Sequence, residues 1–197
     1  EIPAEALYGV QTLRGIENFS ISKFRLSEYP LFIKGLAITK MAAAMANFEL
    51  GLLTVEQKDA IIAACGEILD GKHHDQFPVD MIQGGAGTTT NMNANEVIAN
   101  RALELMGHER GEYQYCSPND HVNCSQSTND AYPTAIHIGM YFKHLQLLPH
   151  LEELIASFRK KGEEFSQIIK MGRTQLEDAV PMTLGQTFNG FASILQD

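Results

Sequence analysis

The chain has 197 residues, and its 15 Lys and Arg against 24 Asp and Glu give a formal net charge of −9. A hydrophobic fraction of 44% with a charged fraction of 20% is typical of a globular protein and excludes a disordered or collagen-like chain. The acidic balance argues against a nucleic-acid binder or an anionic-membrane binder, both of which need basic surfaces. No run of about 18 apolar residues occurs, so we expect no membrane-spanning helix.

Apolar periodicity predicts three helices in the first half of the chain. The first begins at the proline of segment 30–51, a position where a first-turn proline is tolerated. The second occupies 54–71 and begins with a capping box, because Gln57 follows Thr54 by three residues. The third covers about 91–106 and ends at a glycine.

The second half combines polar loops with long helices. Segment 108–130 is polar and without periodicity, and such a stretch often carries function. After Pro133 a helical pattern continues for roughly 35 residues, or about 50 Å, and we expect Pro149 to bend or break it. A loop over 172–181 precedes a last helix that begins near Thr183.

These elements predict a mainly α fold in two parts. Residues 1–130 would form a mainly helical N-terminal domain, and residues 131–197 the first part of a central long-helix bundle. A long amphipathic helix needs comparable helices to cover its apolar face. We therefore expect the chain to be a piece of a longer protein, with no signal peptide and a cytoplasmic location. Three cysteines at irregular spacings predict reduced thiols rather than disulfides or a zinc site: Cys65, Cys116 and Cys124.

Three loops, each at a predicted helix start, are rich in hydroxyl and amide donors. They are Gly84–Asn91, Ser125–Asp130 and Gly172–Gln175. Glycine lets the backbone approach a ligand, and helix N-termini favour anions. Neutral donors without a nucleophile–base pair suit a small polyanion and its enolate-like form. The alternative is that these residues only cap helices, and that Arg173 only pairs with a neighbouring surface carboxylate.

The words of the sequence resemble the aspartase/fumarase superfamily, in that family's order and across essentially the whole chain. The resemblance implies the aspartase/fumarase-type fold and a homotetramer whose active sites are shared between subunits. It implies no organic or redox cofactor, and a possible activating divalent cation has no assigned ligands. The segments that carry the resemblance are Gln76–Asp80, Gln83–Thr88, Asn91–Glu96, Pro118–Asn123, Gln126–Ala135 and Gly172–Pro181.

Two positions favour the ammonia-lyase branch over the fumarase branch. Gln175 stands where fumarases usually carry histidine, and Ser127-Thr128-Asn129 stands where they typically read Ser-Ser-Asn. The resemblance then implies elimination of ammonia from L-aspartate to give fumarate through a doubly charged aci-carboxylate. The implied roles are Thr88, Ser127 and Thr128 on the β-carboxylate, Asn129 with Thr88 on the amino group, Thr174 on the α-carboxylate, and Gln175 in place of the histidine.

One departure limits what this chain can do alone. The family's general base is a serine on a Gly-Ser-Ser loop, and this motif is absent from the 197 residues. We therefore expect the isolated chain to be inactive and to associate through its uncovered helix face. Three alternatives stay open: a fumarase, another lyase that releases fumarate, and a non-catalytic helical assembly module.

Overall fold

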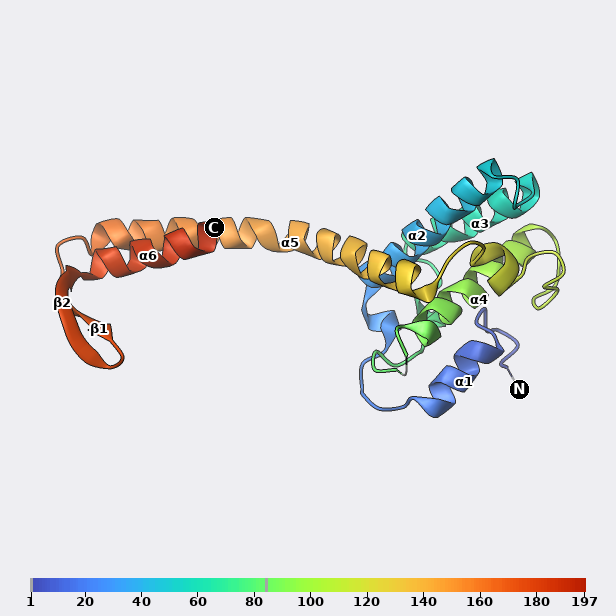
Figure 1. Ribbon diagram of the computed structural model, residues 1–197, viewed down its shortest axis with the longest axis horizontal. Helices are drawn as coiled ribbons and strands as arrows, with labels where there is room; N and C mark the ends of the chain where they lie inside the picture. Colours follow the sequence, from blue (N-terminus) through green and yellow to red (C-terminus); the bar gives the residue numbers. More distant parts are fainter. Residues whose placement is uncertain (1, 84) are drawn as a thin grey trace. The chain divides into compact units, whose positions relative to one another are not determined.

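The computed structural model describes residues 2–83 and 85–197 and is mainly α-helical, as predicted (Figure 1). It divides into two compact units, Glu1–Phe142 and Lys143–Asp197, which are described separately below. The elements in chain order are α1 (Val10–Asn18), η1 (Leu26–Glu28), α2 (Pro30–Glu49), α3 (Val55–Leu69), η2 (His74–Gln76), α4 (Thr88–Leu105), η3 (Pro118–Val122), α5 (Thr128–Glu164), β1 (Ile169–Thr174), β2 (Glu177–Thr183) and α6 (Leu184–Gln196).

Helices α2, α3 and α4 form the core of the first unit. Helix α3 packs against both α2 and α4. The predicted bounds of α2 and α3 are confirmed, and so is the capping box of α3. In that box the Gln57 amide donates to the Thr54 hydroxyl at 3.2 Å, while the Thr54 amide donates to the Gln57 side chain at 3.1 Å.

Helix α1, which the sequence analysis did not predict, is held by a buried carboxylate. Glu96 of α4 is 2% exposed and accepts from the backbone amides of Gly9, Gln11 and Thr12 at 2.9–3.0 Å. The Thr12 hydroxyl adds a fourth hydrogen bond at 2.7 Å. A negative charge at a helix N-terminus is stabilised by the unpaired amides and by the helix dipole. Glu96 thus ties the N-terminal segment to the core.

The first turns of α5 lie close against α2. A Cβ atom on Gly35 would collide with the backbone carbonyl of Ala135, and one on Gly139 would lie 3.1 Å from the carbonyl oxygen of Leu31. Glycine at both positions lets the two backbones approach. This crossing fixes where α5 begins, and therefore the loop that precedes it.

Four local expectations need correction. Helix α4 begins at Thr88 and α5 at Thr128, each a few residues earlier than predicted, because polar capping residues join the first turn. Helix α5 is unbroken through Pro149, since one missing donor costs a long helix little of its hydrogen bonding. The expected loop over 172–181 lies within the antiparallel hairpin of β1 and β2. The expected domain boundary at residue 130 stays a prediction, whereas the contact boundary lies inside α5.

Two further features concern the core. Among the described helices, α2 alone is long and apolar enough to cross a membrane by length and composition, but part of its surface, Lys40 included, is buried against the first unit. The expectation of no membrane span stays a prediction. All three cysteines are free, with Cys65 and Cys116 buried and Cys124 partly exposed.

Candidate functional site

The first polar loop is anchored on the side that precedes its glycines. The buried Asp80 carboxylate accepts from the amides of Ile21, Ser22 and Ile82 at 2.7–3.0 Å. Burial by itself would raise the pKa of Asp80, but these bonds and the Ser22 hydroxyl lower it to about 2. Asp80 therefore stays ionised and holds the start of the loop.

Gln83 connects this loop to α4. Its side-chain oxygen accepts from the Thr90 amide at 2.9 Å, and its side-chain amide donates to the Thr90 hydroxyl at 2.5 Å. The helix cap Gly87 has no side chain, so Gln83 satisfies one amide that the helix N-terminus leaves unpaired. Gly84, part of the predicted loop, lies outside the described residues.

Gly87 also makes room for an aromatic ring. Its φ of +88° is in the left-handed region, and a Cβ atom there would fall inside the ring of Tyr132. Tyr132 in turn packs edge-on against Phe32 of α2, with 5.6 Å between ring centroids. The backbone at the start of α4 is therefore pressed against the first turns of α5.

The second polar loop leads into α5. Ser127 caps the helix, because its hydroxyl accepts from the Asn129 amide at 3.2 Å and its carbonyl from the amides of Asp130 and Ala131. The capping alternative thus holds for Ser127, which remains exposed. The Thr128 hydroxyl accepts from the side-chain amide of Asn91 at 3.4 Å, which links the second loop to α4.

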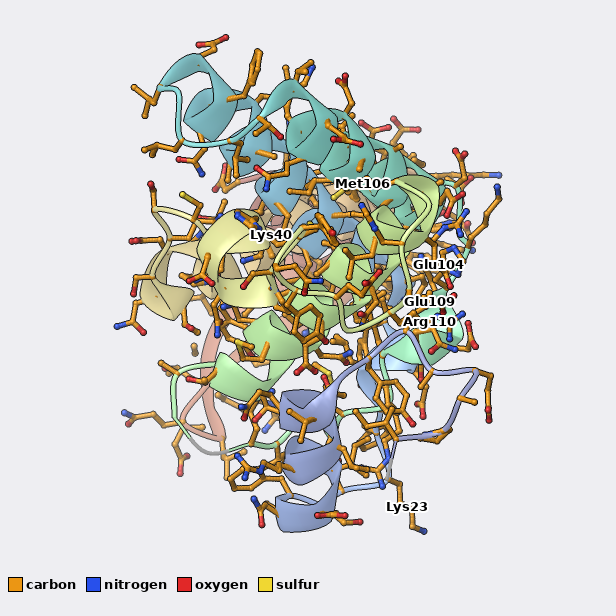
Figure 2. All side chains as sticks on the ribbon, turned by 90° about the vertical axis from the view of Figure 1, so that its right-hand side faces the viewer. Lys23, Lys40, Glu104, Met106, Glu109 and Arg110 are labelled. Carbon is orange, nitrogen blue, oxygen red and sulfur yellow. The ribbon has the colours of Figure 1, made fainter. Side chains whose placement is uncertain are left out.

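A buried lysine that the sequence analysis missed connects the two loops. Lys40 of α2 is 0% exposed, and its Nζ donates to side-chain oxygens of Asn91 at 2.7 Å, Asn123 at 2.9 Å and Gln126 at 3.0 Å. Figure 2 shows Lys40 among the helices of the first unit, whereas Lys23 lies at its edge. The signal was present: Lys40 continues the buried spacing of Ile33, Leu36 and Ala37 on α2.

The ammonium of Lys40 has no carboxylate among its printed partners. Burial lowers its pKa to about 7, against a smaller opposing effect from Cys65. Burial likewise raises the pKa of the Cys65 thiol to about 12, so Cys65 is neutral at physiological pH. The three hydrogen bonds use amide oxygens, which compensate part of the lost hydration.

A cavity of about 550 Å³ lies between the first loop and the start of α5. Asn129 lines it opposite the loop glycines, and Thr88 follows directly after the lining residue Gly87. Both apolar and polar groups face this space. The other lining residues are Met81, Ile82, Gln83, Gly85, Ala86, Tyr132 and Pro133.

The third predicted loop is the tip of the hairpin in the second unit. Thr174 pairs with Glu177, so Gln175 and Leu176 form a two-residue turn. Both have positive φ, +48° and +70°, as a type I′ turn requires. Arg173 bonds Asp178 at 3.0 Å, which confirms the surface-pair alternative for this residue.

The predicted site residues thus fall into two groups. Thr88, Ser127, Thr128 and Asn129 belong to the first unit, where the Asn91–Thr128 bond and the cavity bring their two loops together. Thr174 and Gln175 belong to the second unit. Their roles toward a substrate stay predictions. In the part of the chain that the structure describes, no group of three or more His, Cys, Asp or Glu is arranged to hold a metal ion.

Comparisons with known proteins agree over the whole chain. A family described as lyase matches residues 1–197. An aspartate ammonia-lyase of Pseudomonas canavaninivorans is 60% identical over 197 residues, and one of Escherichia coli is 57% identical over 198 residues. The chain spans only 42% and 41% of the length of these two relatives.

Solved structures show the same fold. A fumarate lyase:delta crystallin from Brucella melitensis bound to cobalt matches with a TM-score of 0.89 and 54% identity, covering 99% of this chain and 42% of that one. A class II fumarase from Schistosoma mansoni matches with a TM-score of 0.83 and 40% identity, covering 99% and 41%. The described architecture is therefore that of a lyase N-terminal region.

Proposed function

This chain belongs to the lyase family, and from that premise we propose that the protein it is part of is an aspartate ammonia-lyase. The proposal is carried by whole-chain identity of 57–60% to aspartate ammonia-lyases, against 40% to a class II fumarase of the same fold. Gln175 and the Ser127–Asn129 segment favour the same branch.

The chemistry requires stabilisation of a carbanion-like intermediate. Removal of the Cβ proton of L-aspartate is feasible when the β-carboxylate becomes an aci-carboxylate held by donors already in place. Thr88, Ser127 and Thr128 would donate to that carboxylate, and Asn129 with Thr88 would hold the amino group. The two loops that carry them meet at the cavity, which supports this assignment.

The remaining roles lie in other parts of the protein. Thr174 would bind the α-carboxylate, and Gln175 would occupy the position that histidine takes in fumarases. The general base would come from a Gly-Ser-Ser loop that these 197 residues do not contain. The isolated chain should therefore show no turnover, and clear turnover by it would contradict this assignment of the base.

A homotetramer with shared active sites and a cytoplasmic location complete the proposal. Large apolar side chains of the second unit are exposed in the single chain, including Leu147, Leu154 and Ile194. Exposed apolar surface of this kind is typical of an interface. Neither an organic cofactor nor a metal is needed for the residues assigned here.

The test uses the full-length reading frame that contains this chain. Purified protein is mixed with fumarate, and fumarate loss is followed by ultraviolet absorbance with and without ammonium. Loss only with ammonium supports the ammonia-lyase. Loss without ammonium identifies a fumarase, the second candidate that the Schistosoma mansoni structure favours.

Two variants test the site against a non-catalytic assembly module. We expect Thr88→Ala and Asn129→Ala each to lower kcat/KM for L-aspartate by about 10²-fold, because each removes a donor to the reacting substrate. Thr54→Ala is the matched control, since Thr54 caps α3 and does not line the cavity. Unchanged substrate binding and turnover in both site variants would support the assembly module.

A further inference from the structure

We propose that Lys40 is a positioning residue that sets the hydrogen-bond direction of the substrate-binding threonine Thr128. The proposal rests on the proposed function, because it concerns how that site is organised. Lys40 lies on α2, outside the motifs that carry the family resemblance, and is completely buried. Its side chain reaches the start of both polar loops through three hydrogen bonds.

The direction of these bonds follows from the chemistry of an ammonium group, which has three donors and no acceptor. Asn91 must turn its oxygen toward Lys40, at 2.7 Å. Its NH₂ group then faces the opposite way and donates to the Asn123 oxygen at 3.0 Å and to the Thr128 hydroxyl at 3.4 Å. Lys40 thereby fixes which end of the Asn91 amide meets Thr128.

The consequence reaches the hydroxyl proton of Thr128. Since the Thr128 oxygen accepts from Asn91, its own O–H remains available as a donor. A carboxylate that gains negative charge during the reaction needs such donors in place beforehand. Without Lys40 the Asn91 amide can flip, and the Thr128 hydroxyl can then donate to Asn91 instead of to the substrate.

Lys40 also holds the loop itself. Gln126, which accepts from Lys40 at 3.0 Å, donates to the carbonyl oxygens of Val122 and Cys124 at 2.9 and 3.1 Å. Asn123 donates back to the Gln126 carbonyl at 3.0 Å. These bonds close the turn directly before Ser127, so the same ammonium sets the path of the backbone that carries the proposed ligands.

Asn47 provides a matched control on the same helix. It is 3% exposed, and its side-chain amide donates to the Cys124 carbonyl at 2.8 Å. It therefore holds the same loop, but none of its printed bonds reaches Asn91 or Thr128. A purely structural role for the buried polar groups of α2 predicts similar losses for both positions, whereas positioning predicts a loss specific to Lys40.

The experiment compares Lys40→Met, Asn47→Leu and wild type in the full-length protein, with L-aspartate as substrate. We expect Lys40→Met to lower kcat by roughly 10²-fold, more than it changes KM, because donors are misplaced in the transition state. We expect Asn47→Leu to keep kcat within about threefold at a comparable loss of thermal stability. Equal effects of the two variants on kcat would overturn the proposal.

A second variant keeps the test decisive if Lys40→Met does not fold. Asn91→Asp retains the size of the side chain and offers a carboxylate to Lys40, but it no longer donates to Thr128. We expect a folded protein whose kcat falls roughly 10-fold or more. A folded Asn91→Asp protein with the kcat of wild type would overturn the proposal by itself.

The outcome remains readable if the proposed function fails. If wild type hydrates fumarate without ammonium, the same variant ratios are measured in that reaction. If wild type has neither activity, hydrogen exchange followed by mass spectrometry replaces the rate. Faster exchange of segment 123–131 in Lys40→Met than in Asn47→Leu supports positioning, and equal exchange overturns it.

Discussion

The two units of this chain treat polar and apolar side chains in opposite ways. In the first unit, charged side chains such as Lys40, Asp80 and Glu96 are buried and hydrogen-bonded. In the second, apolar side chains such as Leu147 and Ile194 are 57% and 73% exposed. The first unit spends its buried polar groups on shaping loops, whereas the second presents surface that a single chain leaves uncovered.

This difference indicates where each unit obtains its stability. A satisfied buried charge is costly to disturb, because removing one partner leaves the others without hydrogen bonds. An exposed apolar side chain contributes little until another surface covers it. The first unit should therefore respond to single polar substitutions, and the second to changes in association.

The largest effect is expected at Glu96. Glu96→Ala leaves the amides of Gly9, Gln11 and Thr12 without their acceptor and should lower the free energy of unfolding by about 3 kcal/mol. Urea denaturation followed by circular dichroism measures this loss. Glu109→Ala, at an exposed position, is the control and should change stability by less than about 0.5 kcal/mol. A similar small change in both variants would contradict the role of Glu96.

The second prediction concerns pH and Lys40. Burial lowers the pKa of folded Lys40 to about 7, so between that pH and its ordinary value of 10.5 the unfolded chain binds a proton that the folded chain has released. The free energy of unfolding should therefore rise with pH from 7 to 9, by up to about 1.4 kcal/mol per pH unit. Above pH 9 the raised pKa values of Cys65 and Cys116 act in the opposite direction.

The measurement compares urea denaturation of wild type and Lys40→Met at pH 7, 8 and 9. The difference in their unfolding free energies should change with pH, and parallel curves would show that Lys40 does not titrate in this range. Cys65 is present in both proteins, so its contribution largely cancels.

A third prediction uses the same capping box in both units. Thr54 with Gln57 begins α3, and Thr183 with Gln186 begins α6. Alanine at either threonine removes one side-chain acceptor at a helix start and should cost about 1 kcal/mol. Local hydrogen exchange at each helix start reports the two losses separately. Protection that falls at α3 but not at α6 would show that α6 does not depend on its own cap.

The smallest effect on folding, but a clear one on association, is expected at Ile194. Ile194→Asp places a charge on an exposed apolar position of α6 and should leave the helix content unchanged. It should shift the chain toward the monomer mass of 21.8 kDa in light scattering, if the exposed face drives association as predicted. Val55→Asp, also exposed but in the first unit, is the matched control.

The sequence predicted the helices of this fold better than its polar contacts. Helices α2 and α3 followed from apolar spacing and a capping box, because both signals are local. Helix α1 was missed, since its start depends on Glu96, far away in sequence. The hairpin was missed because its strands are largely exposed and show little alternation of burial.

For the site, resemblance supplied residues and the structure supplied their arrangement. Thr88 and Asn129 were named from the motifs, and the structure puts them at or beside one cavity. Lys40 could have been suspected from its place on the buried face of α2, but its partners could not. Which amide oxygens meet an ammonium depends on three segments that only folding brings together.

The tip of the hairpin leaves room for laboratory improvement. Gln175 and Leu176 both adopt left-handed backbone conformations, which Asn and Gly adopt more easily than Gln and Leu. Leu176 is 92% exposed, so its side chain has little packing to lose. Leu176→Gly would relieve conformational strain without touching Gln175, which makes this position a starting point for engineering a more heat-resistant enzyme.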